Sequence, residues 1–332
     1  MLSSSMIYLV IIVILALVFD FINGFHDCAN AIATTVSTRA MTLRQAVIMS
    51  AILNFLGAFM SVAVAKTIGN GLVNPTHITS QVIVAALLGA IIWNLFTWMM
   101  AIPSSSSHAL IGGLLGASIA FTGSFVIVDW VNFFWKIALW IFLSPAIGFV
   151  IGYLLMNLLK FVLRKTRPAT VTTVFSKLQI VSAMAMSLNH GGNDAQKAMG
   201  IITMALVSSG MISQFEVPTW VKICCALAMA FGTGIGGKKI IKTMGTNMAK
   251  LAPVNGFAAQ TGAAAIIFTA TMFHAPVSTT QIISTSIMGV AASKRVTAVK
   301  WSLAKDIVIA WVITIPLCGI ISALIMMLFK VI

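Results

Sequence analysis

Long apolar runs separated by short polar connectors make up most of the chain. Each run is about 20 residues long, the length that an α-helix needs to cross the hydrocarbon core of a bilayer. These runs predict an all-α polytopic membrane protein with about ten spans, divided equally by a basic connector. The predicted spans cover residues 6–22, 43–65, 79–101, 105–122, 133–159, 173–188, 220–237, 256–273, 276–292 and 304–329.

The composition supports this membrane class. Of the 332 residues, 60% are hydrophobic and 8% are charged, whereas soluble domains carry roughly 25% charged residues. The scarcity of acidic side chains argues against a soluble enzyme; we expect no enzymatic activity and no cofactor. Residues 1–18 contain no Lys or Arg, so the first run is predicted to be a retained span rather than a signal peptide. The four cysteines lie in apolar runs without zinc-type spacing, which indicates buried hydrophobic side chains.

Basic residues gather in the connectors on one side of the predicted membrane. The net charge is +14, and most of the twenty Lys and Arg residues fall in the central connector or in connectors that alternate to the same side. Basic connectors remain in the cytoplasm of bacterial membrane proteins. We therefore expect a plasma (inner) membrane protein with a cytoplasmic central connector and both termini outside.

Two polar segments inside apolar stretches resemble each other. The first surrounds Asp27 and the second surrounds Asp194, and each also contains histidine, asparagine and glycine. An aspartate at membrane depth costs several kcal/mol and normally marks a substrate or ion path. A matching pair in two halves of a chain is typical of a transporter built from an internal repeat.

Other echoes extend the repeat. Pro103 precedes four serines, and Pro276 precedes valine, serine and two threonines at a similar distance from the second aspartate segment. Because each half holds an odd number of spans, about five, the second half enters the membrane upside down. The predicted organisation is a first inverted repeat at 1–159, a basic connector at 160–177 and a second inverted repeat at 178–332.

Glycines accompany both aspartates. Gly24 lies in the first segment, and Gly191 and Gly192 lie in the second. Close helix packing explains such glycines in many membrane proteins, but their proximity to a carboxylate and amides favours an unwound backbone that faces a ligand. We therefore expect broken helices or re-entrant hairpins at the substrate site, and the sequence leaves open which of the two forms.

The two hydroxyl-rich runs after the prolines are typical of helix N-termini. Such an end offers free backbone N–H groups, a partial positive charge and hydroxyl donors, which together suit an oxyanion. Two ends from opposite halves can converge on one tetrahedral anion. The candidate residues are Ser105, Ser106, Ser107, Ser278, Thr279 and Thr280.

Asp27 and Asp194 imply that a cation accompanies the anion. A carboxylate repels an anion strongly at low dielectric, so the site needs a proton, a sodium ion or a metal ion. Asn30 and Asn193 can supply carbonyl oxygens to a hard cation. Lys197 lies three residues after Asp194, a spacing that favours an ion pair, although contact with the anion stays open.

Other ionisable residues carry weaker signals. His26 and His190 adjoin the aspartates and can carry a proton or simply form hydrogen bonds between helices. Asp20 and Asp306 lie near the ends of predicted spans, and an interfacial position explains them without any function. No metal site is certain from the sequence.

With these residues identified, the chain resembles the inorganic phosphate transporter (PiT) family over nearly its whole length. Residues 24–31 and 191–198 are similar to the two signature segments, and residues 103–108 and 276–281 are similar to the paired hydroxyl-rich hairpins. The short central connector resembles bacterial members, the low-affinity phosphate permease type. The resemblance implies phosphate symport by an inverted-repeat helical fold, as a homodimer.

The resemblance also implies residue roles. The expected cation-coupling residues are Asp27, Asn30, Asn193 and Asp194. The expected phosphate-binding residues are Gly24, Ser105, Ser106, Ser107, Gly191, Gly192, Ser278, Thr279 and Thr280. Sodium-coupled members resemble one another in a glutamate within the second span, where this chain has Asn54. That difference favours proton coupling.

Several functions remain open at this point. We expect proton-coupled phosphate uptake, with transport of a neutral metal–phosphate complex as one form of it. Sodium-coupled phosphate symport and sulfate transport by the same kind of protein are the nearest alternatives. A passive anion channel is disfavoured, because an anion pore prefers Lys or Arg lining over paired carboxylates.

Overall fold

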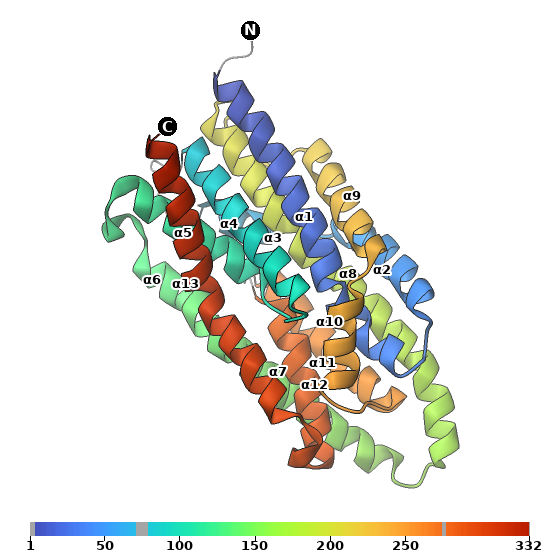
Figure 1. The fold of residues 1–332 in the computed structure, drawn as a ribbon. Coiled ribbons are helices and arrows are strands. Elements are labelled where there is room, and N and C mark those ends of the chain that lie inside the picture. Colours follow the sequence, from blue (N-terminus) through green and yellow to red (C-terminus); the bar gives the residue numbers. More distant parts are fainter. Residues whose placement is uncertain (1–3, 71–78, 274–276, 332) are drawn as a thin grey trace.

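The computed structural model describes residues 4–70, 79–273 and 277–331, and all regular secondary structure within these ranges is helical (Figure 1). Within the described ranges, four short 3₁₀ or π segments adjoin the α-helices: η2 (Phe125–Ile127), η3 (Phe134–Ala138), η4 (Thr243–Asn247) and η5 (Val296–Ala298). The α-helices are α1 (Ser4–Ser37), α2 (Leu43–Gly57), α3 (Ala63–Asn70), α4 (Ser80–Met99), α5 (Ser106–Thr122), α6 (Trp130–Phe133), α7 (Leu139–Leu163), α8 (Pro168–Ser208), α9 (Thr219–Ile235), α10 (Lys238–Lys242), α11 (Pro253–Met272), α12 (Thr279–Lys294) and α13 (Trp301–Val331).

Five helices among the described residues are long and apolar enough to cross a membrane: α1, α4, α7, α8 and α13. The pair α9 and α10, which is bent by 63°, makes a sixth candidate, and α2 and α5 are apolar but shorter. The chain is therefore a multi-pass helical membrane protein, as the sequence predicted. The count of about ten spans stays a prediction.

One predicted span is wrong. The run 43–65 was expected to form one span, but α2 ends at Gly57 and α3 begins separately at Ala63. Between them the side-chain oxygen of Ser61 accepts a hydrogen bond from the Ala63 N–H, a local bond that favours a new helix start. The connector 160–177 contains the end of α7 at Leu163 and the start of α8 at Pro168, and its role as the division between two repeats stays a prediction.

The expected helix breaks at the glycines are also wrong. Helix α1 continues through Gly24, and α8 continues through Gly191 and Gly192. A Cβ at Gly24 would lie 2.4 Å from the Met229 carbonyl oxygen of α9, and one at Gly191 would lie 2.2 Å from the Asn54 carbonyl oxygen of α2. These glycines permit close packing of helices, so their backbone stays inside the helices.

The hairpins α4–α5 and α11–α12 each pack against a long helix from the other half of the chain. Helix α5 packs against α13, and α12 packs against α7. Small residues make both contacts close: a Cβ at Gly116 would lie 2.0 Å from the Gly319 carbonyl oxygen, and one at Gly289 would lie 2.0 Å from that of Phe149. Both chain ends lie at one end of the molecule, and the α7–α8 turn lies at the other (Figure 1).

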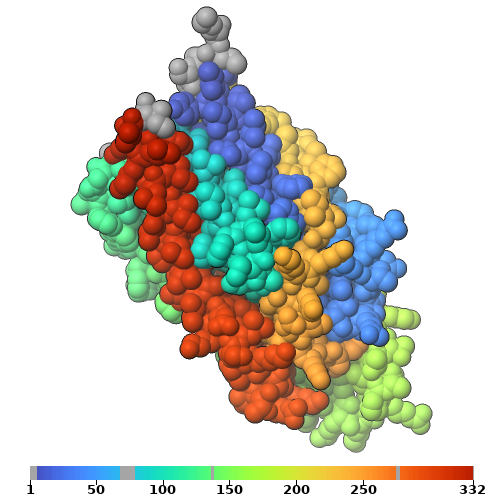
Figure 2. Space-filling view, viewed as in Figure 1, coloured from blue at the N-terminus to red at the C-terminus, as the bar shows by residue number. Residues whose placement is uncertain are grey.

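The outer surface is apolar, whereas the interior contains polar groups. Figure 2 shows α13, α4, α1 and α9–α10 side by side across one face, and helices of this face expose large side chains such as Val10, Ile14 and Leu324. A lipid-facing surface requires this composition. The buried polar side chains therefore include the candidates for a functional site.

Candidate functional site

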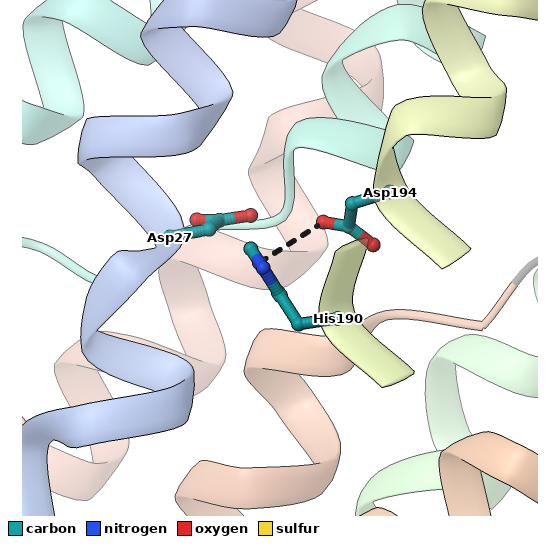
Figure 3. A group of neighbouring side chains, drawn as sticks. All are labelled: Asp27, His190 and Asp194. Carbon is teal, nitrogen blue, oxygen red and sulfur yellow. Dashed lines mark ion pairs between the residues drawn. The ribbon is translucent and has the colours of Figure 1, made fainter. Parts of the chain in front are cut away.

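Two aspartates from different halves face each other inside the protein. Asp27 projects from α1 and Asp194 projects from α8, with exposures of 2% and 0%. The ring of His190 lies between them, and one ligand atom from each of the three residues falls within 4.8 Å of the others (Figure 3). The sequence repeat thus brings its two carboxylates together, although they are far apart along the chain.

Asp27 contacts side chains of α1 and α5, and the α1 contact, His26, also reaches α4. Its Oδ1 lies 2.6 Å from His26 Nδ1, and its Oδ2 accepts a hydrogen bond of 3.2 Å from the Ser106 hydroxyl. The other ring nitrogen of His26 lies 3.0 Å from the Thr97 hydroxyl of α4. The imidazole is fixed between these groups, and a hydrogen on its Nδ1 would be donated to the Asp27 carboxylate.

Asp194 forms a close ion pair with Lys197. Its Oδ2 lies 2.9 Å from Lys197 Nζ and 3.5 Å from His190 Nε2. Two weaker bonds reach the same oxygen, from Asn23 Nδ2 at 3.4 Å and from the Thr279 hydroxyl at 3.5 Å. Lys197 is only 2% exposed, so the ion pair that the spacing favoured lies in the protein interior.

The N-termini of α5 and α12 meet at these carboxylates. Ser105 caps α5 by accepting a bond from the His108 N–H, and Ser278 caps α12 by accepting one from the Gln281 N–H. The first residue of each helix, Ser106 or Thr279, contacts the aspartate of its own half. Two helix ends with free N–H groups therefore converge on one region.

Another predicted residue, Asn30, links the two halves of the chain. Asn30 on α1 donates hydrogen bonds to Thr280 at 2.9 Å and to Thr279 at 3.3 Å. Ser107 is buried in the first turn of α5. Asn193 donates to Thr271, and its side-chain oxygen has no hydrogen-bond partner among the described residues. Pro276 lies outside the described residues.

Asn54 reaches the site through His190. Its side-chain oxygen lies 3.2 Å from His190 Nδ1, and its amide donates to the Thr233 hydroxyl at 2.9 Å. In a neutral histidine one nitrogen donates and the other accepts. If His190 Nδ1 carries the hydrogen and donates it to Asn54, then Nε2 is free to accept a proton or to bind a cation beside Asp194.

The arrangement suits a cation and an anion together. Two carboxylates and one imidazole nitrogen offer ligand atoms to a cation. The side-chain oxygens of Asn23 and Asn193, which have no hydrogen-bond partner in the described part of the chain, lie in the same polar segments. The two capped helix ends offer N–H groups and hydroxyls to an oxyanion. The glycines contribute in another way, because they let α2 and α9 approach the helices that carry the aspartates.

Sequence reasoning missed two features. Asp20 was taken for an interfacial residue but is fully buried in α1, and Thr97 was not considered as the partner of His26. The burial of Asp20 has a signal in the sequence, because polar residues recur at spacings of three and four and share one helix face. These residues are Asp20, Asn23, Asp27, Asn30 and Thr34. Nothing in the sequence alone indicates the pairing of Thr97 with His26.

Long apolar helices around a buried site of carboxylates and helix N-termini define a transporter of small ions, not an enzyme. The chain belongs to the phosphate transporter family, whose profile matches residues 23–322. It is 51% identical over 322 residues to a probable low-affinity inorganic phosphate transporter of Bacillus subtilis (strain 168), covering 96% of each chain. It is also 51% identical over 318 residues to a protein with the same description from Rhizobium meliloti (strain 1021), covering 95% of each.

A solved structure shares the fold. It is described as the sodium-dependent phosphate transporter, and it superposes with a TM-score of 0.89 over 98% of this chain and 100% of its own. The sequence identity is 24%, so this likeness supports the fold and leaves the coupling ion of this chain open. The family expected from the signature segments is confirmed.

Proposed function

We propose that this protein is a secondary transporter that takes up inorganic phosphate together with cations, with the proton as the coupling ion. The observation that carries the proposal is the meeting of the α5 and α12 N-termini at Asp27 and Asp194. Helix ends attract an oxyanion, whereas the carboxylates attract cations. A site with both elements favours the entry of the two kinds of ion together.

Phosphate fits this site better than sulfate. Both anions are tetrahedral, but hydrogenphosphate retains a donor proton near neutral pH. Asp27 or Asp194, when ionised, can accept a hydrogen bond from that proton, while sulfate would present only acceptors to them. A site whose polar groups match the substrate in this way rejects an analogue that leaves them unpaired. Sulfate remains the alternative substrate.

The coupling ion follows from the charges around the site. Asp27 and Asp194 bring two negative charges and Lys197 brings one positive charge, so an entering dianion meets no excess of positive charge. Proton coupling is favoured by His26 and His190, which contact the carboxylates directly, and by the neutral Asn54 beside His190. A sodium ion, or a divalent metal that enters with phosphate as a neutral complex, would use the same three ligand atoms.

An inverted repeat would provide the alternating access that such a transporter needs. Equivalent contacts in the two halves support it. The Trp130 indole N–H donates to the Phe125 carbonyl, and the Trp301 N–H donates to that of Val296. Near the ends of α7 and α13, Lys160 donates to the Ser293 carbonyl and Lys330 to that of Ala120. We propose the divisions 1–159 and 178–332 as the two repeats.

The cellular setting of the proposal is a bacterial inner membrane, with the basic α7–α8 turn in the cytoplasm and both termini outside. The positions of both termini at one end of the molecule and of the α7–α8 turn at the other are compatible with this topology (Figure 1). The homodimer implied by the family resemblance stays a prediction.

Exchange in reconstituted vesicles tests the substrate. Vesicles that contain purified protein and unlabelled phosphate should accumulate external radiolabelled phosphate, and excess external sulfate should not compete. Equal competition by sulfate would contradict phosphate selectivity. Ion currents far above carrier turnover would instead indicate a passive channel, the functional class that the paired carboxylates disfavour.

A further inference from the structure

Asp20 carries a carboxyl group that is buried inside the protein. It lies in the interior of α1 with 0% exposure, and neither of its side-chain oxygens has a hydrogen-bond partner among the described residues. An ionised carboxylate without compensation is among the most costly groups to bury. A stable protein that keeps one in this state can neutralise it with a proton or a bound cation.

The position of Asp20 relates it to the site. Helices α1 and α4 run in the same direction, since Tyr8 contacts Gln81 and His26 contacts Thr97. Asp20 lies seven residues before Asp27, roughly 10 Å along the helix axis toward the chain termini. It shares one face of α1 with Asn23 and Asp27, and Asn23 donates to Asp194.

The helices packed against α1 around Asp20 supply few charges. On α8, Asp194 and Lys197 lie within electrostatic range of its carboxyl group, and on α9 the Cys225 thiol does. Helix α4 contains no ionisable side chain, but its Asn94 is fully buried with an amide group that has no partner in the described part of the chain.

The opposite end of the α1 polar face is different, because its polar groups are paired. Gln179 donates to Thr34, and Gln260 donates to Thr35 and to the Ala31 carbonyl. These bonds close the polar face on the side away from the termini. On this face of α1, the groups without a hydrogen-bond partner among the described residues are the Asp20 carboxyl group and the Asn23 side-chain oxygen, and both lie on the terminus side of Asp27.

We propose that Asp20 is a second proton-coupling position, which carries one proton per transport cycle separately from the Asp27–Asp194 pair. The inference rests on the proposed phosphate–proton symport. A proton passes from water at the terminus side to an Asp20 oxygen, which makes the carboxyl group neutral. It leaves to water on the other side once phosphate has been released, and the ionised carboxylate is restored.

This role follows from charge and ligand count. Neutral Asp20 removes one negative charge within range of Asp194, and that lowers the repulsion of an arriving phosphate dianion. A metal ion at the same place would need several oxygen ligands, whereas the carboxyl oxygens of Asp20 contact no described polar atom at hydrogen-bond distance. A proton needs no such shell.

The test measures the number of protons moved per phosphate. Proteoliposomes with wild-type protein, Asp20→Asn, Asp20→Glu or Asp306→Asn take up radiolabelled phosphate while a pH-sensitive dye reports proton entry. Asp306 is an exposed carboxylate on α13 and serves as the matched control. The proton that phosphate itself carries contributes equally to every protein, so differences between variants report on the side chains.

We expect Asp20→Asn to move one proton fewer per phosphate and to lose the acceleration of uptake at lower external pH. Exchange of phosphate between equal pools should persist, and Asp20→Glu and Asp306→Asn should behave as wild type. The melting temperature of Asp20→Asn should not fall, because asparagine has nearly the shape of the neutral carboxyl group and the Asp20 oxygens have no hydrogen-bond partner among the described residues to lose.

Three results would overturn the inference. One is a wild-type proton count and pH response in Asp20→Asn. Another is loss of both uptake and exchange with a lower melting temperature, which would make the carboxyl group a structural requirement. The third is sodium coupling in the wild-type protein that is lost in Asp20→Asn, which would mean that Asp20 binds sodium rather than a proton. Absence of any phosphate movement by wild type would instead contradict the proposed function itself.

Discussion

Replacement of Lys197 by methionine should destabilise the folded protein strongly. Lys197 is 2% exposed and its ammonium group lies 2.9 Å from Asp194 Oδ2. Methionine keeps the length and the apolar stem but removes the charge. The Asp194 carboxylate, which is fully buried, would lose its short charge partner and keep contacts of 3.4 Å or longer to that oxygen.

The size of the effect follows from the burial of both partners. Removal of one member of a buried ion pair costs about 3–5 kcal/mol, because an uncompensated charge stays in the interior. The bonds from Asn23 and Thr279 to Asp194 are too long to replace it. The double variant Lys197→Met/Asp194→Asn removes that charge, so it should recover most of the lost stability.

Equilibrium unfolding in mixed detergent micelles measures these differences, with Lys305→Met as the control. Lys305 is exposed on α13, and its replacement should change the unfolding free energy by less than about 0.5 kcal/mol. The reasoning fails if Lys197→Met is as stable as the control. It also fails if the double variant is no more stable than the single one.

Three further predictions concern the site and its packing. Asp27→Asn and Asp194→Asn should each abolish cation-driven phosphate uptake while the protein still inserts in the membrane; near-normal uptake by both would contradict their role. Ser106→Ala should weaken the apparent phosphate affinity about 5- to 10-fold, through one lost hydrogen bond of about 1 kcal/mol. A changed cation dependence with unchanged phosphate affinity would indicate instead that the N-terminus of α5 binds the cation. Gly24→Ala should destabilise the folded protein by about 1–3 kcal/mol, because the new Cβ would lie 2.4 Å from the Met229 carbonyl oxygen. The control Gly234→Ala, whose Cβ would have no atom within 4 Å, should be neutral or slightly stabilising. Equal effects of the two substitutions in an unfolding assay would refute the packing role of Gly24.

The helix starts at the site were predictable from local chemistry. Ser105 and Ser278 cap α5 and α12, and proline followed by hydroxyl residues is a local signal for a helix start. The meeting of Asp27 and Asp194 was also expected, because internal repeats place equivalent residues around one centre. These features depend on short segments and their repetition, which the sequence displays directly.

The course of the helices through the glycines was not predictable in the same way. A glycine without a Cβ serves an unwound backbone and a close helix contact equally well. The partners that decide between them are the carbonyl groups of Met229 and Asn54, which lie on other helices. The same error affected Asp20: a first span that ends at residue 22 makes it interfacial, but α1 continues to Ser37.

The central claim is that a cation must accompany phosphate at the facing carboxylates of Asp27 and Asp194. Proteoliposomes with inward proton or sodium gradients, imposed one at a time at a clamped membrane potential, test this claim through uptake of radiolabelled phosphate. The account predicts concentrative uptake with the proton gradient and only equilibration when neither gradient is present. Concentrative uptake that neither cation gradient affects would contradict it.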